Sequence, residues 1–425
     1  MRSRKVLLAT AAAVVVLAGA AAAFVLTRGG DVHNGNVPFT SEPAETPMPT
    51  PAPRKKRGDP LQGFVWAQYG YTKDRRRYLP LNHDLRGPFK RRWRFYGGSL
   101  LEFPPVMAQG RLFLMSNEGW VFALAKQTGR LRWKRRLGSL AAASPGYAGG
   151  RVFVTMLTRP GGSGGLAAAL RARDGKVVWR KPLPSRSESS PVVDGGRVYF
   201  GSEDGTVYAL DAATGARRWT FHASGAVKCG LALSGGRLFF GDYSGRVYAI
   251  RARDGHQVWS TGTSGSLFGL RSGQFYSTPA VAFGRVYIGN TDHRMYSLSA
   301  ATGKLAWTKS TGSYVYSSPA VAEVPGTRPT VYFGSYDGNF YAVDARSGNV
   351  RWTHHDGTPI SGGASIVGDV VYYSSLRRKD TTGLNVRTGR KVFSYPHGEF
   401  NPVVSDGRTM FLTGTSSLYA LRGRR

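Results

Sequence analysis

An internal repeat of 40 to 48 residues covers almost the whole chain after residue 98, and it constrains the fold more than any other feature. Its most regular sign is a glycine followed four residues later by an aromatic residue. The copies are Gly129/Trp133, Gly175/Trp179, Gly215/Trp219, Gly255/Trp259, Gly303/Trp307, Gly348/Trp352 and Gly389/Phe393. Four short strands need about this many residues, and a period of 40 to 50 is typical of propeller blades.

The repeat unit at residues 189–219 predicts where the four strands of a blade lie. Apolar residues alternate around Tyr199, as they do in a half-buried strand. Asp204-Gly205 and Thr214-Gly215 supply tight turns, because glycine accepts positive φ without steric cost. We therefore expect strands at 191–193, 197–201, 206–211 and 216–220.

The two ends of the repeat region supply one further blade. Residues 402–422 contain three strands, and neither a turn nor a tryptophan follows them. The missing outer strand is found at the other end, in residues 89–95 around Trp93. Pairing the two ends closes the ring and removes an open sheet edge. We predict an all-β propeller of eight four-stranded antiparallel blades, with seven blades as the alternative if the unit ending at Phe393 is degenerate.

An uncharged apolar run of 21 residues, 6–26, precedes the repeats and is long enough to span a bilayer as a helix. Arg2, Arg4 and Lys5 favour a cytoplasmic N-terminus, which places the rest of the chain outside. The length of the run favours a retained transmembrane helix, and a cleaved signal peptide is the alternative. We expect an anchor or signal sequence at 1–28, a proline-rich basic linker at 29–62 and the propeller at 63–425, as a single-pass membrane protein with an extracytoplasmic propeller.

The repeat units resemble those of pyrroloquinoline-quinone (PQQ) repeat propellers. Residues 209–219 are similar to the tryptophan-docking motif of that family, in which the tryptophan of one blade packs against the motif of the next. The segment that precedes the first blade there is resembled by Trp66, Tyr69-Gly70, Arg75, Arg77 and Tyr78. The resemblance covers about residues 63–425 and implies a structural docking role for Trp93, Trp133, Trp179, Trp219, Trp259, Trp307 and Trp352.

That family contains quinoprotein dehydrogenases, which use the quinone and calcium, and non-catalytic propellers, such as the propeller lipoprotein of the outer-membrane β-barrel assembly machine. Calcium takes six to eight oxygen ligands, whereas most aspartates of this chain stand in Asp-Gly turns. The single cysteine, Cys229, excludes the adjacent cysteines that such dehydrogenases often carry, and we expect it to be buried. The residues favour a scaffold or binding module for envelope proteins or polymers, without enzymatic activity, cofactor or metal. A PQQ-dependent dehydrogenase of alcohols or sugars is the alternative.

Aligning the repeats on the proline position of the inner strand gives a ring of residues three positions earlier. We call this set the mouth ring: Glu102, Ala142, Glu188, Lys228, Tyr276, Tyr316, Ser361 and Glu399. Three acids on one ring are unusual in a chain with only 25 Asp and Glu residues. We predict that the ring lines a channel mouth that grips a peptide or a glycan. Polar strand-entry positions without a ligand are the alternative.

The net charge of +33 favours anionic partners. A basic segment between residues 73 and 94 concentrates this charge. Its members Arg75, Arg76, Arg77, Arg91 and Arg92 predict binding to lipid headgroups or acidic envelope polymers, with a merely solvated basic surface as the alternative. We do not expect nucleic acid as a partner, because the chain has no recognisable nucleic-acid motif and is expected outside the membrane. We expect a monomer.

Overall fold

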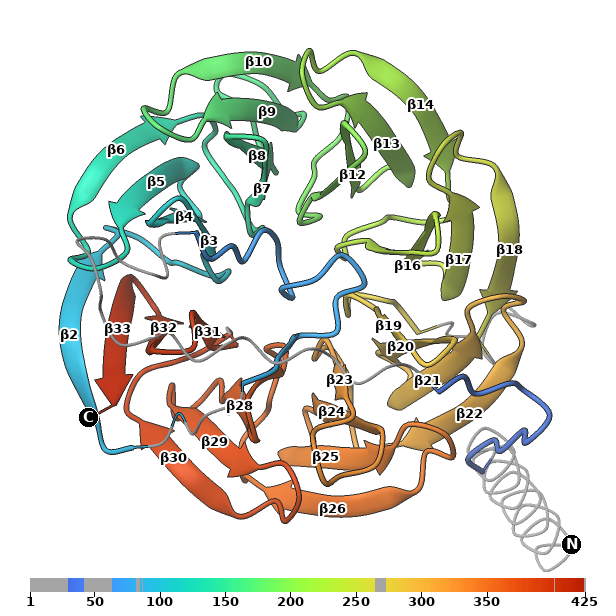
Figure 1. Cartoon of the computed structure of the whole chain (residues 1–425). Helices are drawn as coiled ribbons and strands as arrows, with labels where there is room; N and C mark the ends of the chain where they lie inside the picture. The colour runs from blue at the N-terminus through green and yellow to red at the C-terminus, as the bar shows by residue number, and fades with distance from the viewer. Residues whose placement is uncertain are drawn as a thin grey trace, which may run out of the picture. The chain divides into compact units, whose positions relative to one another are not determined.

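The computed structural model of the protein describes residues 30–41, 63–81, 85, 87–263, 273–400 and 402–423. Within these residues the strands form eight sheets arranged as a ring (Figure 1). The predicted membrane helix at 6–26 lies outside the described residues. In the part of the chain that is described, no helix is long and apolar enough to cross a membrane.

The first four blades follow one another along the chain, and each runs from an inner to an outer strand (Figure 1). They consist of β3 (Val106–Ala108), β4 (Arg111–Met115), β5 (Trp120–Ala125) and β6 (Leu131–Arg136); β7 (Gly146–Ala148), β8 (Arg151–Met156), β9 (Leu166–Arg171) and β10 (Val177–Pro182); β11 (Val192–Asp194), β12 (Arg197–Gly201), β13 (Thr206–Asp211) and β14 (Arg217–His222); and β15 (Ala232–Ser234), β16 (Arg237–Gly241), β17 (Arg246–Arg251) and β18 (Gln257–Gly262). In blade 3 the structure confirms β12 and β13 as predicted, and shifts β11 and β14 by one or two residues.

Blades 5 to 7 repeat this arrangement, and blade 7 gains a fifth strand from the N-terminal part of the chain. They consist of β19 (Ala280–Ala282), β20 (Arg285–Asn290), β21 (Arg294–Ser299) and β22 (Leu305–Ser310); β23 (Ala320–Ala322), β24 (Thr330–Gly334), β25 (Asn339–Asp344) and β26 (Val350–His355); and β27 (Ser365–Val367), β28 (Val370–Ser374), β29 (Thr381–Asn385) and β30 (Lys391–Tyr395), with β1 (Tyr78–Leu79) parallel to β27.

Blade 8 joins the two ends of the propeller. Its inner strands are β31 (Val404–Ser405), β32 (Thr409–Gly414) and β33 (Ser417–Gly423), and its outer strand is β2 (Phe89–Tyr96). β2 and β33 lie side by side (Figure 1) and pair antiparallel. In this register Trp93 lies opposite Ala420. The predicted closure of an eight-bladed ring is confirmed, and the seven-bladed alternative is wrong.

Seven tryptophans join blades at seven of the eight junctions of the ring, and blade 7 carries Phe393 at the equivalent position. Their indole N–H groups donate to backbone carbonyls of the following blade at 2.9–3.2 Å, pairing Trp93 with Lys126, Trp133 with Ala172, Trp179 with Ala212, Trp219 with Ala252, Trp259 with Ala300, Trp307 with Ala345 and Trp352 with Val386. Each indole ring also covers a turn glycine of that blade. A Cβ at Gly215 would lie 2.7 Å from the ring of Trp179, so only glycine fits. These contacts agree with the docking role that the resemblance implies for the seven tryptophans.

An inner segment, residues 66–79, runs across the centre of the ring (Figure 1). Its backbone carbonyls accept hydrogen bonds from amides at the inner strands of several blades: Ala67 from Tyr147, Lys73 from Leu233, Asp74 from Val281 and Arg76 from Val321. Trp66, Tyr78 and Leu79 are buried. The inner segment therefore fills the centre of the ring at this level with its own backbone and side chains.

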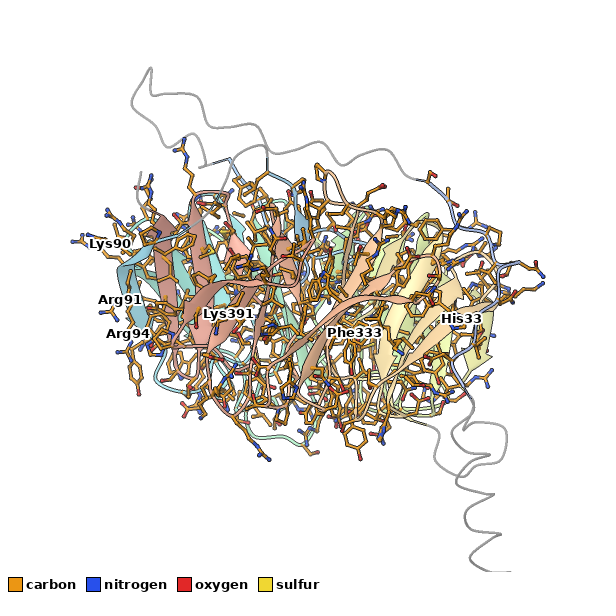
Figure 2. The ribbon with its side chains drawn as sticks, turned by 90° about the horizontal axis from the view of Figure 1, so that it is seen from below. His33, Lys90, Arg91, Arg94, Phe333 and Lys391 are labelled. Atoms are coloured by element: carbon orange, nitrogen blue, oxygen red, sulfur yellow. The ribbon has the colours of Figure 1, made fainter. Side chains whose placement is uncertain are left out.

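Residues 33–40 form a strap that packs on blade 5, although they belong to the predicted linker 29–62. Val37 is buried, and Phe39 stacks on Phe283 with 5.3 Å between the ring centroids. Arg285 donates to the backbone carbonyls of Val37 at 2.8 Å and Pro38 at 3.3 Å. This part of the expected linker is therefore fixed to the propeller, and Figure 2 shows its first residue, His33, against the rim of the ring.

Candidate functional site

Two layers of residues from successive blades lie next to each other near the centre of the ring, at the level where a mouth was predicted. The mouth ring precedes the inner strands, and a second layer comes from the turns between the second and third strands of the blades. Backbone amides of the turns donate to carbonyls two residues before the ring position: Glu203 to Arg186, Tyr243 to Ala226, Thr291 to Gln274 and Tyr336 to Tyr314. This repeated bond sets each turn side chain beside a side chain of the mouth ring.

A charged network joins blades 3, 4 and 5 at this mouth. The Lys228 ammonium lies 2.9 Å from Glu188 Oε1 and 3.0 Å from Glu203 Oε1, and 5.3 Å from the centre of the Tyr243 ring. The Tyr276 hydroxyl donates to Glu188 Oε2 at 3.2 Å. Burial, with a smaller effect from the Glu188 carboxylate, raises the pKa of Tyr276 well above its usual range. The phenol therefore keeps its proton and can remain a hydrogen-bond donor.

Four tyrosines continue this network into blades 5 and 6, and we call Tyr276, Tyr314, Tyr316 and Tyr336 the tyrosine cluster. Tyr316 lies at its centre, with ring centroids 5.7 Å from Tyr276, 5.8 Å from Tyr314 and 5.0 Å from Tyr336. Tyr314 is 43% exposed, so the cluster reaches solvent. Tilted and edge-to-face contacts of this kind hold aromatic rings in fixed positions.

The remaining acids of the mouth ring come from blades 8 and 1. Glu399 lies 3.5 Å from the Lys379 ammonium and accepts a hydrogen bond from Thr415. Glu102 is half-buried, and burial followed by the charges of Glu188 and Glu399 raises its pKa to about 7. The structure therefore brings the three predicted acids into one electrostatic neighbourhood, although they lie far apart in the sequence.

The other two positions of the ring carry small side chains. Ala142 is buried and Ser361 is half-buried. The sequence reasoning missed the turn layer, which adds Glu203, Tyr243 and Tyr336 to the mouth. A signal was present, because each of these residues stands two positions after the glycine that ends the second strand of its blade.

The structure corrects the prediction for Arg75 and Arg77, because both side chains are completely buried in the inner segment. Arg75 donates to the carbonyls of Leu231 at 2.9 Å and Ser190 at 3.1 Å. Arg77 donates to the carbonyl of Pro319 at 3.0 Å. Burial lowers the pKa of Arg75 to about 9. These guanidinium groups join blades 3, 4 and 6 from inside the ring and cannot reach a surface ligand.

The other predicted cations lie nearer to solvent. Arg76 donates to the carboxylate of Asp74 at 2.9 Å and is only 16% exposed, so most of its charge is already paired. Arg91 and Arg92 are exposed on β2, the outer strand of blade 8. Figure 2 shows Lys90, Arg91 and Arg94 of the same strand pointing outward at the rim. Binding of anionic surfaces therefore stays a prediction for Arg91 and Arg92.

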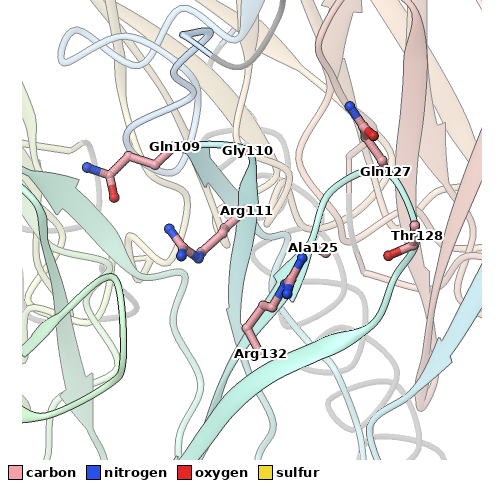
Figure 3. Close-up of a pocket in the computed structure, with 7 residues that line it drawn as sticks. All are labelled: Gln109, Gly110, Arg111, Ala125, Gln127, Thr128 and Arg132. Carbon is pink, nitrogen blue, oxygen red and sulfur yellow. The ribbon is translucent and has the colours of Figure 1, made fainter. Parts of the chain in front are cut away.

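A pocket of about 430 Å³ lies at the turns of blade 1, and its lining contains none of the predicted site residues (Figure 3). It is lined by Gln109, Gly110, Arg111, Ala125, Gln127, Thr128 and Arg132. In blades 3 and 4 the arginines equivalent to Arg111 hold a neighbouring turn: Arg197 donates to the carbonyl of Arg253 at 2.8 Å and Arg237 to that of Ala301 at 3.1 Å. This position in the repeat therefore commonly serves contacts between blades.

The residues present do not fit a calcium-dependent quinone centre. Among the described residues, no group of three or more His, Cys, Asp or Glu side chains is placed so that it could hold a metal ion. At the mouth, Glu188 and Glu203 converge on the ammonium of Lys228. Cys229 is buried, as predicted, and burial raises the pKa of its thiol to about 12, which makes it a poor nucleophile.

Solved structures with the same fold include two dehydrogenases and a BamB protein. Quinohemoprotein alcohol dehydrogenase ADHIIG from Pseudomonas putida HK5 is 15% identical, with a TM-score of 0.71 over 85% of this chain and 80% of that one. A europium-containing methanol dehydrogenase is 14% identical, with a TM-score of 0.71 over 85% and 98%. BamB from Moraxella catarrhalis is 18% identical, with a TM-score of 0.64 over 80% and 99%. At these identities the likeness shows the fold alone.

The sequence itself matches one family over most of the propeller. A comparison with curated proteins finds no significant match. The family described as outer membrane protein assembly factor BamB matches residues 90–159, 156–228 and 204–424, which together span the whole ring of blades. The chain therefore belongs to this family of PQQ-repeat propellers.

Proposed function

We propose that this chain is a non-enzymatic binding module of the cell envelope, which acts as a monomer and engages an envelope protein at the mouth of its channel. The observation that carries the proposal is the continuous network from Glu188 through Lys228 and Tyr276 to the tyrosine cluster. Side chains fixed by one another lose little entropy when a partner binds. A protein partner also agrees with the family description, which names an assembly factor.

The N-terminal sequence supports an extracytoplasmic, membrane-held position for the propeller. The apolar run 6–26 is long enough to span a bilayer, and Arg2, Arg4 and Lys5 precede it. A propeller placed there would meet envelope proteins and anionic headgroups. The exposed cations Arg91 and Arg92 on β2 would add about 1 kcal/mol each near an anionic surface.

Crosslinking in intact cells tests the binding site. A photocrosslinking residue in place of Tyr314 should capture an envelope protein, because this side chain is the exposed part of the tyrosine cluster. The matched control is the same residue in place of Tyr96, which is 63% exposed on β2, away from the mouth. The adducts should stay in the membrane fraction after alkaline washing. Identical adducts from both positions would contradict a specific mouth site, and release by the wash would contradict the anchor.

Quinone chemistry is not expected from this chain. The purified full-length protein, supplied with PQQ and calcium, should bind no stoichiometric quinone and should reduce no redox dye with alcohols or sugars. The physical reason is that the ammonium of Lys228 already pairs with Glu188 and Glu203, so these two carboxylates are not free to bind a divalent cation. Calcium-dependent dye reduction that is lost in a Glu188→Gln variant would establish the dehydrogenase reading instead.

A further inference from the structure

Among the described residues, two of the three carboxylates of the mouth ring pair with a lysine. Glu188 is paired with Lys228, and Glu399 lies 3.5 Å from Lys379. Among the described residues, no hydrogen bond or ion pair is formed by the carboxylate of Glu102. A half-buried carboxylate without a partner is costly to keep charged, and a cation supplied from outside would relieve that cost.

The aromatic side of the mouth favours the same kind of group. The faces of tyrosine rings carry negative potential and attract ammonium and guanidinium groups. Lys228 already shows this arrangement, because its ammonium lies between two carboxylates and 5.3 Å from the centre of the Tyr243 ring. An acid–tyrosine mouth that holds one ammonium internally is chemically suited to a second one.

The net charge of the chain opposes the preference of the mouth for a cation, which makes that preference informative. The chain carries a net charge of +33, so its average field repels cationic ligands. Any cation that binds must therefore be held by short-range contacts that overcome that repulsion. The acids of the mouth ring supply such contacts, and two of them, Glu188 and Glu102, lie near enough to act on Tyr276 of the tyrosine cluster.

We propose that the mouth recognises a lysine or arginine side chain of a partner protein, which pairs with Glu102 and lies against the tyrosine cluster. This inference rests on the proposed binding function and names the chemistry of the partner. The basic side chain completes the third carboxylate–cation pair of the ring. A neutral or acidic segment gains nothing from Glu102 and is not selected.

The pairing predicts a pH dependence of known sign. Glu102 is charged above about pH 7 and takes up a proton below it, so affinity for a cation should fall as the pH drops from 8 to 6. The groups that act on Glu102 are Glu188, Glu399 and Tyr276. Asp292, in the turn between β20 and β21, is a further carboxyl group near this range, because burial raises its pKa to about 6. A variant at Glu102 separates the two contributions.

Binding of fluorescein-labelled pentalysine to the purified full-length protein tests the proposal. We expect saturable binding at pH 8, about tenfold weaker binding at pH 6, and a loss of about tenfold at pH 8 in Glu102→Gln, since a charge-assisted contact is removed. Glu102→Gln should also abolish most of the pH dependence. The matched control is Glu323→Gln, which makes the same charge change at an exposed position between β23 and β24.

Three outcomes would overturn the proposal: no binding of pentalysine, equal binding by Glu102→Gln and Glu323→Gln, or a pH dependence that survives in Glu102→Gln. Tight binding of chitotetraose that Glu102→Gln leaves unchanged would assign the tyrosine cluster to sugars instead. Crosslinking at position 314 separates this inference from the proposed function. A partner still captured by the Glu102→Gln variant would leave the binding function standing and remove the basic side chain from it.

Discussion

Replacing Trp93 with alanine is expected to lower the free energy of unfolding by about 3–5 kcal/mol, as large-to-small changes at packed aromatic sites do. The indole N–H donates to the carbonyl of Lys126 at 3.2 Å, and the ring covers Gly129 and lies 5.9 Å from Phe411. These contacts join blade 8 to blade 1 at the point where the ring closes. Urea unfolding followed by tryptophan fluorescence and circular dichroism measures the loss.

Two variants calibrate this result. Trp219→Ala removes an equivalent indole that donates at 3.0 Å to Ala252 and is also partly buried, so it should cost a similar amount. Val392→Ala alters a side chain that is 52% exposed on β30 and should change stability by less than about 0.5 kcal/mol. If Trp93→Ala behaves like Val392→Ala, docking at the closure contributes nothing and β2 is held by backbone pairing alone.

The variant Gly215→Ala should destabilise the propeller by about 2–5 kcal/mol for two separable reasons. Gly215 has a φ of +74°, which costs an L-residue about 1–2 kcal/mol. A Cβ there would also lie 2.7 Å from the ring of Trp179, and relieving that overlap should cost about 1–3 kcal/mol more. Thermal and urea unfolding of the purified variant measure the sum.

Gly196 provides the matched control, because its φ is also +74° and a Cβ there would meet nothing within 4 Å. Gly196→Ala should therefore show the backbone cost alone. The difference between the two variants is the packing cost of the docked tryptophan. Equal losses in both would mean that the indole moves aside freely and that docking is loose.

The repeat predicted the ring well because each blade makes the same contacts. The Gly-x-x-x-Trp pattern encodes a turn, a strand and a docking contact at once, so Trp219 with Gly215 identifies a blade without its neighbours. The closing strand was predictable because Trp93 lies in a predicted strand that has no blade of its own in the sequence around it. Strand positions inferred from one repeat therefore apply to the next repeat, because the same residue pattern recurs there.

The inner segment could not be predicted in the same way. Arg75 and Arg77 stand in a basic run, which in most proteins is exposed. Their partners are the backbone carbonyls of Leu231, Ser190 and Pro319. Every residue type has a backbone carbonyl, so the sequence does not show which residues will accept these bonds. The strap was missed for a similar reason, since Arg285 binds the carbonyls of Val37 and Pro38 rather than their side chains.

At the mouth, alignment of the repeats predicted which residues share a level but not which ones touch. It placed Glu188, Lys228, Tyr276 and Tyr316 on neighbouring blades, and the structure joins them through ion-pair, hydrogen-bond and ring contacts. The turn residues that complete the network were overlooked because only the inner strand was aligned. The raised pKa of Glu102 depends first on burial and then on acids from blades 3 and 8, and both need three-dimensional distances.

The pairing of β2 with β33 has a consequence for biosynthesis. Ribosomes make β2, ending at Tyr96, long before β33, which begins at Ser417, so the growing chain carries an unpaired strand while every other blade forms. An unpaired strand is a template for intermolecular association. The unpaired β2 carries four positive charges, which repel β2 of a second copy of the chain. They come from Lys90, Arg91, Arg92 and Arg94. The positive charges of β2 thus oppose association of the growing chain until β33 is made and pairs with β2.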